Sequence, residues 1–238
     1  MILGLTKQSL TVASYNIRKA IGVDRRRKPE RILDVLAELD ADIIALQEAD
    51  RRFGERVSAL PFSLIDGHGI YKHVPVAIRP NSIGWHGNAL LVKQHIEILD
   101  CGALHLPSIE PRGAVVADLR IGKSKLRVVG LHLDLSGLWR RRQSATILHH
   151  LAAQNDRVPS IMMGDTNEWR PANGCLRDFG AHHVAAPTGP SYHARMPVAA
   201  LDRIFVSPEL TIVDAGVHVS PKARLASDHL PIWAKLKG

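Results

Sequence analysis

Residues 158–167 read Val-Pro-Ser-Ile-Met-Met-Gly-Asp-Thr-Asn, an apolar run that closes on glycine, an acid and an amide. The run up to Met163 predicts a buried strand, and Gly164 lets the backbone turn sharply after it. Asp165 and Asn167 then project to the same side, since they are two residues apart. Such a pair can position a water molecule and steady a phosphoryl oxygen. A plain Asx turn is the alternative.

Two further polar residues lie at the ends of apolar runs. Asn16 closes the strand expected over 10–17, and Glu48 follows the strand expected over 42–46. Taken singly, an asparagine that caps a turn and an ordinary strand-end carboxylate are competing explanations. Gathered at one rim of a sheet with a histidine beside them, such oxygens are the ligands that a hard divalent cation needs for hydrolysis at phosphorus.

Ser227-Asp228-His229 joins an acid to a histidine just before the last expected strand. Adjacent residues on an extended chain point in opposite directions, so Asp228 is assigned to the metal and not to His229. Asp202, which opens the strand expected over 201–206, is the candidate partner of His229. A histidine paired in this way is a plausible general base near neutral pH.

His132 and Asp134 alternate along another strand end and face the same side. A histidine that contacts phosphate or assists the leaving group is one interpretation, and a histidine satisfied within a sheet is the other. An HxD pair also occurs in zinc hydrolases, but the sequence has no HxHxDH motif and no Cys/His zinc cluster. It also has neither a Gly-x-Ser-x-Gly elbow nor a P-loop.

The remaining patterns predict an α/β protein with two packed sheets and helices outside. Helices are expected from Pro29, with an apolar stripe at Ile32, Leu33, Leu36 and Leu39, and over 138–154, with Ile147, Leu148, Leu151 and Ala152 inward. Further strands are expected over 88–93, 114–121, 126–133, 212–219 and 232–236. A loop is expected over 51–84, and the absence of repeats or linkers favours one domain over residues 1–238.

The formal net charge is +8 and the isoelectric point about 9.8, which favours an anionic partner such as nucleic acid or an anionic membrane without choosing one. Solubility alone is the simpler explanation of the charge. No run is apolar enough for a transmembrane helix and no signal peptide is evident, so a cytoplasmic location is expected. Cys101 and Cys175 are interpreted as buried or idle thiols.

Taken in order, these segments resemble the endonuclease/exonuclease/phosphatase superfamily, which includes deoxyribonuclease, abasic-site endonucleases and sphingomyelinases. The motifs that carry the resemblance span nearly the whole chain, from Tyr15-Asn16-Ile17 to Ser227-Asp228-His229-Leu230-Pro231. Gly87-Asn88-Ala89-Leu90-Leu91, Arg112-Gly113 and Gly164-Asp165-Thr166-Asn167-Glu168-Trp169 look like the compact bacterial members. Thr188-Gly189-Pro190 departs from relatives that carry an aromatic residue there, so the loop beside the substrate is expected to differ.

The resemblance implies a four-layer α/β/β/α sandwich, with the site at one rim and Mg²⁺ or Mn²⁺ as cofactor. The implied metal ligands are Glu48, Asn16 and Asp228. The implied catalytic residues are His229 oriented by Asp202, His132, Asp165 and Asn167. Arg112, Asn88 and Asn16 would contact the phosphate or the substrate.

These features predict a metal-dependent phosphodiesterase acting by in-line attack of water, with nucleic acid as the first choice of substrate. A phospholipid or sphingolipid headgroup is the alternative, and a catalytically silent module that binds polyanions is the rival from another class. Residues 25–28 and 140–142 are basic clusters that follow strand ends and are expected to form an electropositive collar at the site. A solvated loop and helix face is the other interpretation. The oligomeric state is left open.

Overall fold

Two nearly continuous apolar runs form strands that are buried on both faces. The computed structural model describes residues 9–51, 54–76, 79–154, 156 and 158–238. Strand β1 (Leu10–Asn16) pairs in parallel with β2 (Ile43–Gln47), with Asn16 opposite Gln47. Ile43 packs toward the second sheet while its neighbour Ile44 packs toward the helices outside. Each strand therefore contributes to two separate cores.

The described residues form two six-stranded sheets. The first has the order β11-β12-β1-β2-β4-β3. Its other strands are β3 (Tyr71–His73), β4 (Ala89–Lys93), β11 (Thr211–Val217) and β12 (Ile232–Lys237). The second has the order β5-β6-β7-β8-β10-β9. It is built from β5 (Glu97–Leu104), β6 (Gly113–Ile121), β7 (Ser124–His132), β8 (Ser160–Asp165), β9 (Val184–Ala185) and β10 (Asp202–Val206).

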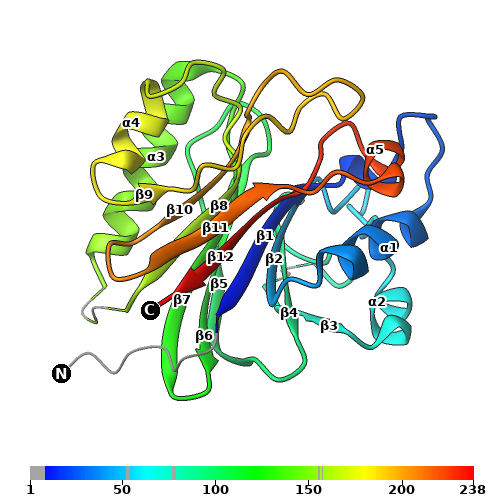
Figure 1. The fold of residues 1–238 in the computed structure, drawn as a ribbon, viewed down its shortest axis with the longest axis horizontal. Helices are drawn as coiled ribbons and strands as arrows, with labels where there is room; N and C mark the ends of the chain where they lie inside the picture. The colour runs from blue at the N-terminus through cyan, green and yellow to red at the C-terminus, as the bar shows by residue number, and fades with distance from the viewer. Residues whose placement is uncertain (1–8, 52–53, 77–78, 155, 157) are drawn as a thin grey trace.

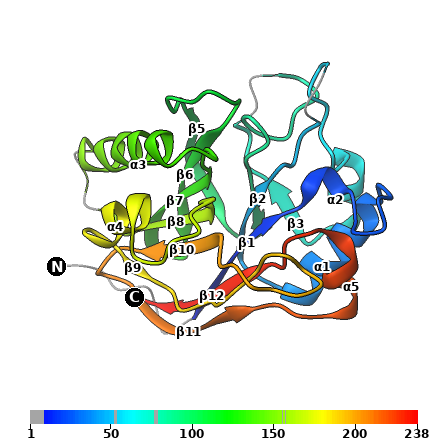
Figure 2. The ribbon, with the colours of Figure 1, turned by 90° about the horizontal axis from the view of Figure 1, so that it is seen from above.

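Helices cover the outer faces of both sheets, as Figures 1 and 2 show. The first sheet carries α1 (Pro29–Leu39), α2 (Phe62–His68) and α5 (Pro221–Ala226), and the second carries α3 (Gly137–Ala152) and α4 (Gly174–Gly180). A short turn of helix, η1 (Arg18–Ala20), follows β1. The result is the four-layer α/β/β/α sandwich expected from the sequence.

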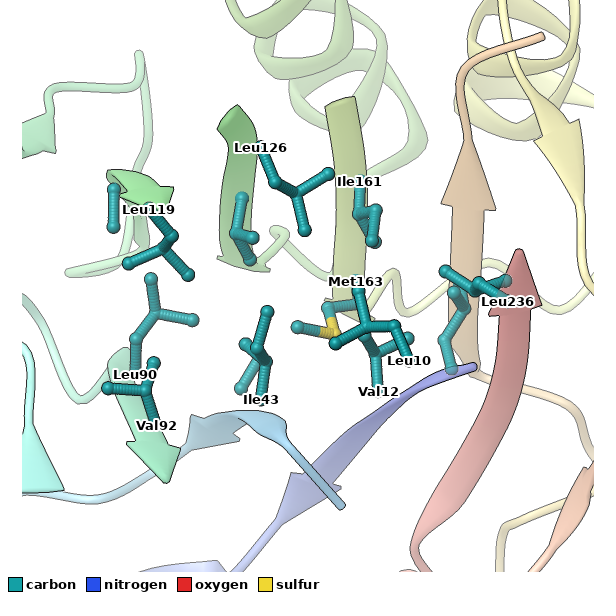
Figure 3. Close-up of a cluster of buried hydrophobic side chains, with 14 of the residues drawn as sticks. Leu10, Val12, Ile43, Leu90, Val92, Leu119, Leu126, Ile161, Met163 and Leu236 are labelled. Carbon is teal, nitrogen blue, oxygen red and sulfur yellow. The ribbon is translucent and has the colours of Figure 1, made fainter. Parts of the chain in front are cut away.

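Three apolar clusters match the three interfaces between these layers. The central cluster lies between the sheets, where Val12 and Ile43 of the first sheet face Ile161 and Met163 of the second (Figure 3). A second cluster joins the first sheet to α1, α2 and α5, and a third joins the second sheet to α3 and α4. Burial of apolar surface on both faces of each sheet supplies the main driving force for this arrangement.

Strand direction brings the polar strand ends to one edge, which we call the catalytic rim. Strands β1 and β2 run in parallel, as do β7 and β8, where His132 lies opposite Asp165. Strand β10 runs antiparallel to β8, so that its first residue, Asp202, is also opposite Asp165. The carboxyl ends of β1, β2, β7 and β8 therefore meet the start of β10 at the catalytic rim.

Several sequence-based expectations were incomplete. The segment expected to be a loop over 51–84 contains α2 and β3, and strand β5 was missed, because all three are short or lack a clear alternation of burial. The hairpin of β6 and β7 is present, with a two-residue turn at Gly122-Lys123. Both cysteines are free, with Cys175 buried and Cys101 partly so.

The inner face of α3 differs from the expected apolar stripe. Ile147 is buried as expected, but Leu148 and Leu151 are only partly buried and Ala152 is exposed. Polar side chains fill the rest of the inner face, namely Arg140, Gln143 and Ser144. Their contacts come from distant parts of the chain, so no local pattern could reveal them.

A substitution at Gly164 can test how closely β8 packs against β7. A Cβ atom added there would lie 1.8 Å from the carbonyl oxygen of Leu131, so Gly164→Ala forces the two strands apart. We expect a loss of roughly 2 kcal/mol in the free energy of unfolding, measured by urea denaturation. Gly102→Ala is the matched control, since a Cβ on that strand glycine meets nothing within 4 Å. Equal urea midpoints for the two variants would contradict this account of the close approach.

Candidate active site

Asp165 is the residue on which the site converges. Its side chain is 2% exposed, and Oδ2 accepts a hydrogen bond of 3.0 Å from Nδ2 of Asn16. The same oxygen lies 3.5 Å from Nε2 of His132 and 3.8 Å from Nε2 of His229. Oδ1 accepts from the backbone N–H of Asn167 at 2.9 Å. The structure thus brings together five predicted site residues from distant segments of the chain.

Asp202 orients His229, as the sequence predicts. Oδ2 of Asp202 lies 2.8 Å from Nδ1 of His229 and also accepts a hydrogen bond from the hydroxyl of Ser191. Burial by itself lowers the pKa of His229, but the charge and hydrogen bond of Asp202, helped by Asp165 and Asp228, raise it to about 10. Before any cation binds, His229 therefore holds its proton at neutral pH, with Nε2 directed toward Asp165.

His132 is in the opposite state. Burial, followed by the positive charge of Arg112, lowers the pKa of His132 to about 3, so its imidazole is neutral. The guanidinium of Arg112 lies against the ring, with Nη1 2.8 Å from Nδ1, and also forms an ion pair with Glu110 at 3.5 Å. Arg112 is consequently held at the wall of the site, where the resemblance implied a contact with phosphate.

Glu48 lines a pocket next to this cluster, with an empty volume of about 490 Å³. Its carboxylate forms an ion pair with the ammonium group of Lys19, and Asp228 pairs with Nε of Arg18 at 3.2 Å. Arg18, Lys19 and Ala20 all have positive φ, at 46°, 58° and 58°, so a left-handed turn directs two consecutive cations to two of the expected metal ligands. This conformation is unfavourable for residues with a Cβ, and such conformations cluster at functional sites.

The donor set around this turn suits a hard cation. Glu48 and Asp228 supply carboxylate oxygens and Asn16 supplies an amide oxygen, which are the ligands that Mg²⁺ and Mn²⁺ prefer. Both carboxylates retain partial exposure, 25% and 19% of the side chain, so an ion can reach them. Each carboxylate is paired with a basic side chain. A metal cation could take the place of Lys19 at Glu48 or of Arg18 at Asp228.

A second group of possible ligands lies deeper. Among the described residues, one group of three histidine, cysteine or acidic side chains has ligand atoms within 4.8 Å of one another, and it comprises Asp165, Asp202 and His229. Nδ1 of His229 is already hydrogen-bonded to Asp202. This group is therefore better described as a hydrogen-bonded catalytic cluster, with the expected metal ligands beside it.

Asn88 and Asn167 use their side-chain amides within the protein. Nδ2 of Asn88 donates to the carbonyl oxygens of Trp85 and Gly113, and the residue is fully buried. Nδ2 of Asn167 donates to the carbonyl of Leu133 at 2.9 Å. The contact of Asn88 holds the loop before β4 to the start of β6, and the contact of Asn167 holds the loop after β8 to the end of β7. Asn88 is not among the residues that line the pocket.

The two basic clusters differ. Residues 140–142 make contacts within the protein, whereas residues 25–28 are exposed. Arg140 is 7% exposed and pairs with Glu168 at 2.9 Å, so it fastens α3 to the loop after β8 and cannot serve in a free collar. Arg142 lies over the ring of Trp139, and Arg141 is 3.7 Å from Asp178. Residues 25–28 are all exposed and remain available to an anionic partner.

Sequence reasoning missed several residues of the site. Arg18 and Lys19 could have been noticed as a basic pair that begins two residues after Asn16. Ser191 and Tyr192 gave no comparable signal, because both approach His229 only through the folding of the loop before β10. The ring of Tyr192 lies 4.8 Å from that of His229, and the ring of Trp169 lies 6.1 Å from Tyr192.

Residues 13–229 match the sequence profile of the Endonuclease/Exonuclease/phosphatase family. The Uncharacterized protein YbhP of Escherichia coli strain K12 is 27% identical over 251 residues, which cover 96% of each chain. The match to the family profile takes in every site residue discussed above, from Asn16 to His229.

Solved structures share the fold at lower identity. TDP2 of D. rerio, complexed with a single strand DNA product, superimposes with a TM-score of 0.76 at 17% identity, covering 98% of this chain and 100% of that one. The mannosyl-6-phosphatase Bt3783 of Bacteroides thetaiotaomicron gives 0.76 at 19% identity, covering 95% and 99%. At these identities the likeness establishes the sandwich alone.

Lys19 should compete with the cation for Glu48. Lys19→Met removes the ion pair that must otherwise be broken, so we expect Mn²⁺ to bind roughly five- to tenfold more tightly, because a partly buried pair is worth about 1 kcal/mol. Isothermal titration calorimetry without substrate measures this directly. Lys28→Met, an exposed lysine on the same loop, is the control. Unchanged or weaker binding in Lys19→Met would contradict the competition.

Asp202 should be the main reason that His229 keeps its proton. We expect ring ¹⁵N chemical shifts in chelator to show His229 protonated through about pH 8 in the wild-type protein. In Asp202→Asn the imidazole should lose its proton near neutrality, because the burial that lowers the pKa of His229 is no longer offset by this charge. Asp214→Asn, at an exposed position of β11, should leave the titration unchanged. Identical curves for all three proteins would refute the assignment.

Proposed function

Because the chain belongs to the endonuclease/exonuclease/phosphatase family, we propose that it is a divalent-metal-dependent phosphodiesterase that hydrolyses its substrate by in-line attack of water. The observation that carries the proposal is the convergence of Asn16, His132 and His229 on the buried carboxylate of Asp165. A carboxylate placed among these groups, beside the pocket that His132 lines, can hold a water molecule and take up its proton.

Each neighbour of Asp165 has a separate part in this proposal. The backbone N–H of Asn167 fixes Oδ1 of Asp165, so that Oδ2 keeps one orientation. His229, protonated and held by Asp202, donates a hydrogen bond to a phosphoryl oxygen as negative charge develops there. His132 is neutral and offers Nε2 to the same region, next to the guanidinium of Arg112.

The expected ligands Glu48, Asn16 and Asp228 would hold Mg²⁺ or Mn²⁺ at the edge of this cluster. When bound, such a cation neutralises charge on the phosphoryl oxygens and so lowers the cost of reaching the transition state. Asn16 connects the two parts of the site, since its amide N–H group donates to Asp165 while its oxygen accepts from the backbone N–H of Arg18. Water attack then needs no covalent intermediate on the protein.

Two classes of phosphodiester substrate are candidates. Positive charge favours nucleic acid as first choice, with a phospholipid or sphingolipid headgroup as alternative. The related structures include a complex with a single strand DNA product and a mannosyl-6-phosphatase, so they span more than one substrate class. The exposed apolar side chains described below are the observation that favours the lipid.

Hydrolysis of bis(p-nitrophenyl) phosphate against p-nitrophenyl phosphate, with Mg²⁺, Mn²⁺ or chelator, tests the proposal. We expect metal-dependent cleavage of the diester, lowered by about a thousandfold or more in Glu48→Gln and in His229→Ala because each removes a group that stabilises the transition state. Glu97→Gln is the control, since that exposed carboxylate only pairs with Arg120 at the far end of the sheet. A folded Glu48→Gln variant with full activity would overturn the proposal, and a preference for the monoester would replace it with a phosphatase.

A further inference from the structure

The most exposed apolar side chains of this protein are not scattered over its surface. Among the described residues, six large hydrophobic side chains are between 61% and 73% exposed, and we call them the apolar rim: Ile109, Leu135, Leu138, Trp169, Met196 and Val198. Every other exposed large hydrophobic residue in the described part of the chain is at 53% or below. Single exposed apolar residues are normal, but a group of this kind on one side needs an explanation.

All six residues lie on segments at the catalytic rim. Ile109 precedes β6, which starts there, and Leu135 and Leu138 follow β7, which ends there. Trp169 follows β8, and Met196 and Val198 lie in the loop before β10. The opposite edge, where β6 turns into β7 at Gly122-Lys123, carries none of the six.

The apolar rim is continuous with the catalytic cluster. Trp169 contacts Tyr192 edge-on, with ring centroids 6.1 Å apart, and Tyr192 lies 4.8 Å from His229. Trp169 and Leu135 also line one surface hollow with an empty volume of about 920 Å³. A surface that pressed against these side chains would therefore lie close to Tyr192, which packs against His229.

Positive charge lies between and beside these apolar side chains. Arg141 and Arg170 line the same hollow as Leu135 and Trp169. Arg195, next to Met196, reaches across to the loop after β1, where its Nη2 donates to the carbonyl of Val23 at 3.4 Å. That contact brings the exposed basic residues 25–28 close to the loop that carries Met196 and Val198, and Figure 1 shows the two loops, blue and golden, on the same side.

We propose that the catalytic rim docks on an anionic lipid surface, with the apolar rim entering the headgroup layer and residues 25–28 and the neighbouring arginines contacting lipid phosphates. Apolar side chains interleaved with arginine and lysine are the composition that such an interface requires. The charge of the arginines complements an anionic bilayer, and a bilayer can meet the several segments that carry the apolar rim at once. The identity of the substrate as a phospholipid diester rests on the phosphodiesterase activity proposed above, whereas the docking itself does not.

Other occupants fit these side chains less well. A single nucleic-acid strand would use arginine and stacking surfaces, and of the six residues only Trp169 has a ring on which a base can stack. Leucine, isoleucine, valine and methionine offer a base neither a hydrogen bond nor a stacking face.

Vesicle flotation in chelator tests docking without any turnover. The probes are vesicles of phosphatidylcholine with and without phosphatidylglycerol, and the protein is the full chain. We expect the wild-type protein to float with the anionic vesicles and much less with the zwitterionic ones. The variant Leu135→Ser/Leu138→Ser/Met196→Ser/Val198→Ser should bind at least about tenfold more weakly, as should Arg25→Ala/Arg26→Ala/Arg27→Ala. Val184→Ser/Val213→Ser, at exposed positions away from the catalytic rim, should bind as the wild type does.

Catalysis provides the second measurement. The fourfold serine variant should hydrolyse soluble bis(p-nitrophenyl) phosphate at the wild-type rate, because none of its four positions contacts the catalytic cluster, and far-ultraviolet circular dichroism confirms that it is folded. Equal flotation of the serine variant and the wild type would overturn the proposal. So would a wild-type protein that ignores anionic vesicles and instead binds a single-stranded oligonucleotide through the same four residues.

Discussion

The buried carboxylate of Asp165 is the constraint on which the site depends. A carboxylate that is 2% exposed is costly unless hydrogen-bond donors surround it. Hydrogen bonds reach it from Asn16 at the end of β1 and from the backbone N–H of Asn167 after β8, while Nε2 of His132 and Nε2 of His229 lie 3.5 and 3.8 Å away. No one of these segments can satisfy Asp165 alone. The site is therefore complete only when the two sheets are packed face to face, so that folding and assembly of the catalytic cluster are one event.

Hydrogen bonds among the segments at the catalytic rim hold the site residues close together. Oγ of Ser227 donates to the carbonyl of Asn16 at 2.7 Å, which fixes the segment carrying Asp228 and His229 against the end of β1. The carbonyl of Asp228 accepts from the backbone of Ala194, and Ser191 reaches Asp202, so the loop before β10 is tied to the same place. This is the loop that also carries Met196 and Val198. The exposed surface of the catalytic rim is thus built on the same hydrogen bonds that position the histidine.

The sequence could predict what depends on local pattern and could not predict what depends on distant contacts. Nearly continuous apolar runs made β1 and β2 recognisable, and the polar residues at their ends located Asn16 and Glu48. The inner face of α3 was misjudged because Arg140 finds Glu168 twenty-eight positions along the chain, a partner that periodicity does not reveal. Short elements such as α2, whose seven residues include Gly67, carry too little pattern to be distinguished from a loop. The left-handed turn at Arg18 and Lys19 contains no glycine, so the sequence carries no sign of its positive φ angles.

That turn links the electrostatics of the site to its surface. Without a bound cation, Lys19 and Arg18 neutralise Glu48 and Asp228, while His229 keeps its proton between Asp165 and Asp202. A divalent cation held by Glu48 and Asp228 would take over this compensation and would free Lys19 and Arg18 at the same rim, where Arg112 also lines the pocket. The two basic side chains that neutralise the metal-free carboxylates could then contact an incoming phosphate. Metal binding and anion binding would be coupled through this turn, because the same two side chains would serve both.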